Sequence, residues 1–231
     1  MKKISIVIII LSIAACSYAQ QPDAMKEIEK IKAFYSGPEL KHVTGQMLLT
    51  DKTTGRQIDK VDFEYWIKDK QLYTKMNYIE ILNSDNLYIM VNHRLHSICV
   101  RPVKDNVAKT ASPYMDISQL EKLLSMKNIK SSVSSSGGLN KLTLSGLQGS
   151  NFSDVTVNYE TADNRIRSFY ANVINASRED KDQLVLQVTY TKTEKINVTT
   201  DPPVFSPSKY VVIGKGGELS FNGVYQGYTK L

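Results

Sequence analysis

The three histidines are the residues of this sequence best suited to bind a metal or transfer a proton. His93, His96 and Cys99 follow one another at intervals of three, a spacing that resembles a metal-binding motif. On a β-strand, residues three apart point to opposite faces of the sheet, so such side chains do not converge on one ion. We therefore expect a turn histidine at position 93, a strand histidine at position 96 and no metal site.

No other pattern of side chains matches a catalytic motif. The sequence lacks the G-x-S-x-G turn that carries the nucleophile of α/β-hydrolases. Asp62 and Glu64 alternate with apolar residues, as polar residues do on the solvent face of a strand. The glycine-rich residues 214–217 fit a hairpin turn and not a phosphate-binding loop. We expect a protein that is not an enzyme and uses no cofactor.

The first residues have the pattern of a bacterial export signal. Lys2 and Lys3 precede an apolar run over residues 4–15, and small residues follow that run. The run is too short to span a bilayer, which takes about 20 apolar residues. We expect residues 1–19 to be a signal peptide, and the mature chain to work in the periplasm without a transmembrane span.

Two routes for processing this signal stay open. Ser17-Tyr18-Ala19 fits cleavage by an ordinary signal peptidase. Ile13-Ala14-Ala15-Cys16 resembles the lipobox of bacterial lipoproteins, in which Cys16 is lipidated and anchors the chain to a membrane.

Composition excludes some classes of function. The net charge is +6, and removal of residues 1–19, which hold Lys2 and Lys3 and no acid, leaves a mild +4. The basic residues are scattered and form no stripe, which argues against a nucleic-acid partner. Residues 20–231 suit a single domain. Cys99 lies in an apolar run, where we expect a buried free thiol.

Apolar residues recur with two different periods along the chain. Spacings typical of amphipathic helices occur over residues 23–35 and 115–126. Alternation of apolar and polar residues predicts about five antiparallel strands after each helix. A proline-rich tail from Asp201 contains a short hairpin.

This order of elements predicts an α+β fold that is mainly β. Two helices cannot cover ten strands evenly, so we expect a curled antiparallel sheet of about 10–11 strands, an unclosed β-barrel with two lid helices. Its interior either is packed with side chains or holds an apolar ligand. The candidates to line a lipid-binding cavity are Met47, Leu49, Phe63, Tyr65, Ile67, Met76, Leu142, Leu144, Leu184, Leu186 and Val188. The lid candidates are Ile28, Ile31, Leu120 and Leu123.

Three segments add a family resemblance. They are Thr44-Gly-Gln-Met-Leu-Leu, Val157-Asn-Tyr-Glu-Thr-Ala-Asp-Asn-Arg-Ile and Val204-Phe-Ser-Pro-Ser-Lys-Tyr. With the element order, which covers most of the mature chain, they resemble the LolA-like lipoprotein carriers. The resemblance implies an apolar cavity under a helical lid and the transport of lipid-modified clients across the periplasm. The family latches its lid with an inward arginine, which has no match here, since Arg56 falls in a predicted turn.

The sequence thus favours a non-enzymatic periplasmic carrier or binder of lipoproteins or other acyl-chain ligands. The alternative is a structural or accessory subunit of a bacterial envelope complex, with a solid core and possible anchoring through Cys16. In that case Trp66 and the proline-rich tail are the candidate contacts with envelope partners.

Overall fold

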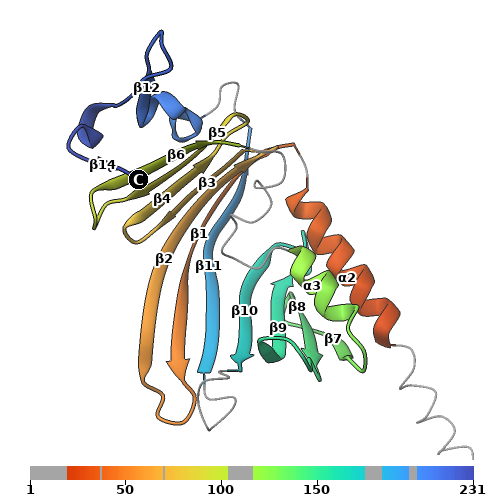
Figure 1. Cartoon of the computed structure of the whole chain (residues 1–231). Coiled ribbons are helices and arrows are strands. Elements are labelled where there is room, and N and C mark those ends of the chain that lie inside the picture. The colour runs from red at the N-terminus through yellow and green to blue at the C-terminus, as the bar shows by residue number, and fades with distance from the viewer. Residues whose placement is uncertain (1–19, 37, 70, 104–116, 175–183, 198–201) are drawn as a thin grey trace, which may run out of the picture. The chain divides into compact units, whose positions relative to one another are not determined.

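The computed structural model describes residues 20–36, 38–69, 71–103, 117–174, 184–197 and 202–231 (Figure 1). The expected signal peptide, with Cys16, lies outside this part of the chain, as do Met115 and Asp116. Among the described helices, neither is both long enough and apolar enough to cross a bilayer.

Most described residues lie in one sheet of twelve strands, ordered β14-β6-β5-β4-β3-β2-β1-β11-β10-β9-β8-β7. Strands β7 and β14 are its two edges, so within the described residues the sheet does not close on itself. Strand β14 pairs in parallel with β6. The neighbouring strands from β2 to β6 pair antiparallel, and so do those from β7 to β11. The predicted fold class, mainly β with an unclosed sheet and helices, is confirmed.

The element bounds are close to those that periodicity predicts. The helices are α2 (Gln20–Tyr35) and α3 (Ile117–Leu124). The first strands are β1 (Leu40–Asp51), β2 (Gln57–Lys68), β3 (Gln71–Met76), β4 (Ile79–Asn83), β5 (Leu87–Asn92) and β6 (Ser97–Pro102). After α3 come β7 (Lys130–Ser136), β8 (Leu139–Ser145), β9 (Phe152–Glu160), β10 (Ile166–Val173) and β11 (Leu184–Ile196). The tail holds the 3-10 turns η1 (Pro203–Phe205), η2 (Pro207–Lys209) and η3 (Gly223–Tyr225), and the strands β12 (Val211–Ile213), β13 (Leu219–Phe221) and β14 (Thr229–Lys230).

Local chemistry accounts for the turn between β7 and β8. Gly137 and Gly138 are the two residues of this hairpin turn, with φ angles of 59° and 81°. A two-residue turn with positive φ at both positions matches the twist of the flanking strands, and glycine adopts it without strain. This turn fixes the register in which Ser136 faces Leu139.

The chain divides into two compact units, which share β1, β2 and β11. The helix-covered unit comprises residues 1–36, 48–59 and 115–189, and the tail-covered unit comprises residues 37–47, 60–114 and 190–231. Each is described by itself below. The expected single domain over residues 20–231 stays a prediction.

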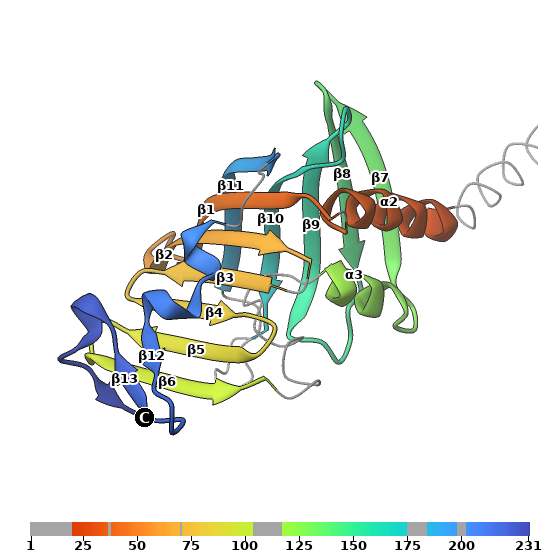
Figure 2. The ribbon, with the colours of Figure 1, turned by 90° about the horizontal axis from the view of Figure 1, so that it is seen from above.

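In the helix-covered unit, α2 and α3 lie side by side against one face of the strands β7–β10 (Figures 1 and 2). The register places two apolar rows on one face of the sheet: Leu144–Val155–Ala171–Leu186 and Leu142–Val157–Phe169–Val188. Ile28, Ile31 and Leu120 of the helices have no exposed surface, nor do Leu142 and Leu144. Helices and rows together form the core of this unit.

Polar contacts fasten the helices of this unit. Tyr159 of β9 donates a hydrogen bond from its hydroxyl to Glu27 of α2 over 2.6 Å. Burial raises the pKa of Tyr159 well above its ordinary value, as does Glu27, so the hydroxyl stays protonated and can donate. Lys32 of α2 forms an ion pair with Glu121 of α3 over 2.7 Å.

In the tail-covered unit, a second core lies on one face of the meander β2–β6. Tyr73, Leu82, Ile89, Val91 and Ile98 of the sheet are buried in one cluster with residues of the tail. The tail residues in this cluster are Phe205, Tyr210, Val211 and Tyr225. Figure 2 shows the tail lying across the meander strands. The tail ends as β14, which pairs with the beginning of β6.

We expect Leu142→Ala to lower the free energy of unfolding by about 2–5 kcal/mol, because it leaves a cavity beneath the helices. The matched control is Thr143→Ala, whose side chain lies on the other face of β8 and is only half-buried. It should change stability by less than about 1 kcal/mol. Urea denaturation measures both values, and equal losses would contradict the assignment of the helix-covered face as core.

Candidate functional site

The residues predicted to line a cavity are divided between the two units. The helix-covered unit holds Leu49, Leu142, Leu144, Leu184, Leu186 and Val188. Leu142 and Leu144 have no exposed surface, nor do the lid candidates Ile28, Ile31 and Leu120, while Leu123 is 9% exposed. A side chain without exposed surface touches no space as large as a water molecule. In this conformation no space for an acyl chain remains beside Leu142 and Leu144. The role of the two helices as a lid stays a prediction.

The other candidates lie in the tail-covered unit, on the face of the meander opposite its core. Phe63, Tyr65 and Ile67 of β2 pair with Met76, Thr74 and Leu72 of β3. Those positions continue across β4, β5 and β6 through Ile79, Ile81, Met90 and Cys99. We call this surface the meander face; it consists of Phe63, Tyr65, Ile67, Leu72, Thr74, Met76, Ile79, Ile81, Asn83, Tyr88, Met90, Asn92, Ser97, Cys99 and Arg101. Met47 of β1 belongs to the same unit and is half-buried.

The meander face is mainly apolar, and it is incompletely covered. Phe63, Tyr65 and Thr74 at its β2–β3 end are buried, at 4%, 6% and 0% exposure. Ile81, Met90 and Cys99 toward β6 are half-buried. A contiguous apolar surface that stays partly open to water marks a binding surface more often than scattered single residues do.

Rigid and adaptable side chains occupy different parts of the meander face. Phe63 stacks on Tyr65 with ring centroids 5.0 Å apart and meets Tyr190 of β11 edge to face at 5.7 Å. Met76 and Met90 have unbranched side chains that adjust to irregular apolar partners. The meander face thus combines an aromatic wall at β2 with a deformable surface on β3 and β5.

Two buried hydroxyl groups on this face have no hydrogen-bond partner among the described protein atoms. They are Oγ1 of Thr74, which lies between Tyr65 and Ile81 on neighbouring strands, and Oγ of Ser97. A buried polar group without a partner costs about 1–3 kcal/mol. Thr74 therefore places an unused hydrogen-bonding group in the middle of an apolar surface.

The histidines and Cys99 differ from their sequence predictions. His93 and His96 both lie in the turn between β5 and β6, and His96 has a φ of 46°, so the predicted strand histidine is wrong. The apolar run that begins at Leu95 predicts a strand, but Leu95 is still in the turn and is 69% exposed. Cys99 is free, but it is half-buried and not buried, because it faces Met90 on the open side of the meander. Within the described residues, no three His, Cys, Asp or Glu side chains gather as metal ligands do.

Sequence reasoning identified only Phe63, Tyr65, Ile67 and Met76 of the meander face and missed most of it. Leu72 was not among the candidates, although the alternation of β3 could have placed it beside Ile67. In β5 both faces are apolar over residues 87–91, so periodicity alone does not tell which side the tail covers.

A buried carboxylate, Glu80 of β4, organises the tail side of the same sheet. Its Oε1 accepts a hydrogen bond from Nε2 of His93 over 2.9 Å, and its Oε2 accepts one from the Tyr210 hydroxyl over 3.1 Å. Lys209 lies 3.4 Å from Oε2, and Tyr228 bonds Nδ1 of His93 over 2.9 Å. We call Glu80, His93, Lys209, Tyr210 and Tyr228 the Glu80 cluster. It joins β4 and the β5–β6 turn to both ends of the tail.

Opposing effects act on the carboxyl of Glu80. Burial disfavours its ionised form, but the charge of Lys209 and the hydrogen bonds from His93 and Tyr210 outweigh burial and hold its pKa below the ordinary value. Burial and Glu80 raise the pKa of Tyr210 far above its usual range, so this hydroxyl remains a donor. The hydrogen-bonding groups of the Glu80 cluster pair with one another, which fits a structural role in attaching the tail to the sheet.

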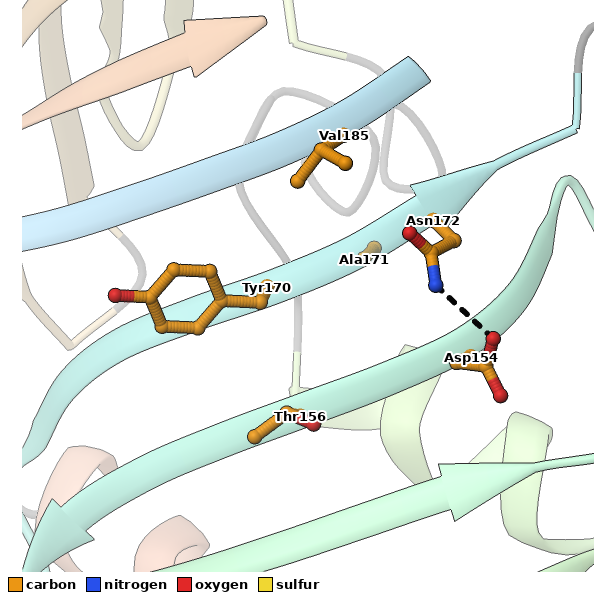
Figure 3. Close-up of a pocket in the computed structure, with 6 residues that line it drawn as sticks. All are labelled: Asp154, Thr156, Tyr170, Ala171, Asn172 and Val185. Atoms are coloured by element: carbon orange, nitrogen blue, oxygen red, sulfur yellow. Dashed lines mark hydrogen bonds between the residues drawn. The ribbon is translucent and has the colours of Figure 1, made fainter. Parts of the chain in front are cut away.

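A shallow pocket lies on β9, β10 and β11 in the helix-covered unit (Figure 3). Asp154, Thr156, Tyr170, Ala171, Asn172 and Val185 line it, and its volume is about 70 Å³. Asn172 donates a hydrogen bond to Asp154 over 3.0 Å along its wall. This volume holds a few water molecules, which is too little for an acyl chain.

We expect Glu80→Gln to reduce stability at pH 7 by about 1.5–3 kcal/mol, because it removes the charge from buried hydrogen bonds. The folded pKa of Glu80 lies below 4.5, so its contribution is present above that pH and is lost as the pH falls through the folded value. Urea denaturation from pH 7 to pH 3 should therefore show a weaker acid dependence in the variant. Glu29→Gln, at an exposed position of α2, is the control. The same acid dependence in both variants and the parent would contradict this role.

We expect Thr74→Val to raise the free energy of unfolding by about 1 kcal/mol, because the methyl replaces a buried hydroxyl that has no protein partner. Thr44→Val is the matched control, since Oγ1 of Thr44 is hydrogen-bonded to Thr191 over 2.9 Å. The control should not gain stability. A loss of stability in Thr74→Val would show that its hydroxyl is satisfied in solution.

Comparison with known proteins leaves the family of this chain unassigned by sequence. No protein-family model matches the sequence. No curated protein matches it either.

Similar solved structures do exist. An uncharacterized conserved protein from Thermus thermophilus has a TM-score of 0.45 at 9% identity, over 77% of this chain and 90% of that one. LprF from Mycobacterium bovis has a TM-score of 0.38 at 12% identity, over 80% and 98%. A LolA superfamily protein from Nitrosomonas europaea has a TM-score of 0.35 at 9% identity, over 76% and 94%. These likenesses concern the fold alone.

Proposed function

We propose that this chain is a non-enzymatic binder or carrier of lipoproteins or other ligands with acyl chains, acting in the periplasm. The observation that carries this proposal is the meander face, a mainly apolar sheet surface that lies on the side opposite the tail and is partly exposed to water. The periplasmic location rests on the export signal expected at residues 1–19.

The dimensions of the meander face suit a hydrocarbon chain. Five strands, β2 to β6, contribute to it, and neighbouring strands lie about 4.8 Å apart, so its apolar rows extend over roughly 19 Å. Each methylene that leaves water there contributes about 0.8 kcal/mol to binding. An acyl chain of ordinary length can therefore bind without any specific polar contact.

The three histidines are engaged in structural contacts, which supports a binding role. His42 stacks on Trp66 at 4.0 Å and donates to Glu64 over 2.8 Å. His93 belongs to the Glu80 cluster, and the ring of His96 meets that of Tyr228 at 5.2 Å. None of these contacts brings a histidine to the side chains of the meander face.

In this proposal the helices α2 and α3 gate the second apolar face. The residues they cover have no exposed surface, so a ligand reaches Leu142 and Leu144 only if the helices move. Two polar contacts, Glu27 with Tyr159 and Lys32 with Glu121, must then break. Moving the helices away from the sheet costs free energy, and the loss of these two contacts is part of that cost. Ligand binding has to offset it.

The alternative function is that of a structural subunit of an envelope complex. The tightly filled core of the helix-covered unit favours it, and so do the exposed apolar residues Ile213 and Val224 of the tail, which are 56% and 82% exposed. Trp66 is a poor contact candidate, because its ring packs against the tail-covered core and stacks on His42.

We expect Ile81→Glu to weaken acyl-chain binding at least tenfold, because binding then desolvates a carboxylate. The matched control is Ile58→Glu, an exposed position of β2 outside the meander face, which should bind as the parent does. Calorimetric titration with hexadecanoate measures binding, and circular dichroism verifies folding. Native mass spectrometry of the envelope-purified protein distinguishes the two functions. Copurified lipid supports the carrier, whereas a stoichiometric protein partner without lipid would overturn it.

A further inference from the structure

The meander face ends in a single cation, Arg101 of β6. Arg101 pairs with Tyr88 of β5. This pair lies two residues along the strands from the pair formed by Met90 and Cys99. Val100, between Cys99 and Arg101, packs against the tail-covered core on the opposite side. Strand alternation therefore places Arg101 on the meander face, at the border of its apolar rows.

The guanidinium of Arg101 is oriented and exposed. It lies over the ring of Tyr88, 4.3 Å from the ring centroid, and the residue is exposed to solvent. Stacking on an aromatic ring fixes the plane of a guanidinium and leaves its N–H edge available for an oxyanion. Within the described part of the chain, no carboxylate forms an ion pair with Arg101.

The rest of the surface complements this charge. Ile81, Met90 and Cys99 supply half-buried apolar area beside Arg101. A ligand with a hydrocarbon chain and a negative end matches both parts. A neutral hydrocarbon matches only the first.

We propose that the meander face selects acyl chains with an anionic headgroup, a carboxylate or a phosphate, and that Arg101 binds this headgroup at the β6 edge. The proposal rests on the proposed acyl-binding function and names its ligand class. The acyl chain lies on the half-buried part of the meander face, from Arg101 past Met90 toward Ile81, and the headgroup stays at the solvent border. Charge-assisted, bidentate pairing with an arginine is stronger than neutral hydrogen bonding and favours planar or tetrahedral oxyanions.

Lysolipids with identical hexadecanoyl chains test this selection. The purified mature protein is titrated with lysophosphatidylglycerol and with zwitterionic lysophosphatidylcholine, both below their micelle concentrations. The rate of Cys99 modification by a small thiol reagent reports occupancy of the face, and calorimetry gives the affinity. Hexadecanoate separates a carboxylate from a phosphate headgroup, and inorganic phosphate alone tests whether the anion binds without its chain.

We expect the parent to bind both anionic lipids about tenfold more tightly than lysophosphatidylcholine, and to bind inorganic phosphate undetectably at millimolar concentration. Arg101→Gln should abolish the preference and leave lysophosphatidylcholine binding unchanged, while Arg101→Lys should retain part of it. Arg94→Gln is the matched control, because Arg94 also lies over a tyrosine, Tyr78, at 5.8 Å. The preference should shrink as salt is raised, because Arg101 is exposed.

The possible outcomes separate this inference from the function on which it rests. Equal affinity for both headgroups, with Cys99 protected, would overturn the selection by Arg101 and leave acyl binding intact. Loss of the preference in Arg94→Gln as well would also overturn it. No binding and no protection of Cys99 by any lipid would overturn both proposals.

Discussion

The structure depends on one requirement, that an apolar sheet face must be covered by something other than water. An antiparallel sheet has two such faces wherever its strands are apolar on both sides. Here α2 and α3 cover one face of β7–β10, and the tail covers one face of β2–β6. The meander face is the apolar surface left with incomplete cover among those described. The proposed function and its ligand class both follow from that incomplete cover.

The Glu80 cluster explains why the tail stays on its own side of the sheet. The tail brings few regular backbone hydrogen bonds, since it consists mostly of short turns and a three-residue hairpin. Its attachment instead uses the buried apolar contacts of Phe205 and Tyr225 and a charged anchor at Glu80. Because a buried carboxylate without partners is very unfavourable, the anchor specifies where Lys209 and Tyr210 must lie. The tail cannot cover the meander face without giving up these contacts.

Local patterns carried much of the fold. The helix over residues 23–35, the alternation of β2 and the glycine turn before Leu139 depend on neighbours in sequence, and the structure shows all three. The face shared by Phe63, Tyr65 and Met76 was also predicted, because a strict period of two fixes it. The complete burial of Leu142 and Leu144 depends on how the helices pack against the sheet. The periodicity of apolar residues does not predict this packing.

Long-range contacts were beyond sequence reasoning. The bond between Glu80 and Tyr210 joins residues 130 positions apart, and no spacing rule announces it. The apolar run from Leu95 to Val100 predicts a strand that starts directly after a turn around His93, whereas the turn extends over residues 93–96 and β6 begins at Ser97. That turn decides that Cys99 and Arg101 share a face with Met90. Trp66 is a candidate contact on sequence grounds because tryptophan often anchors interfaces. The sequence does not reveal that its ring stacks on His42 of another strand.

The most direct test of the account is photo-crosslinking of the mature protein with a hexadecanoate that carries a photoreactive group in mid-chain, followed by peptide mapping. The account predicts adducts on the strands of the meander face, in peptides that contain Met76, Ile81 or Met90. Adducts confined to other regions, such as the exposed tail around Val224, or labelling that excess hexadecanoate does not suppress, would contradict it.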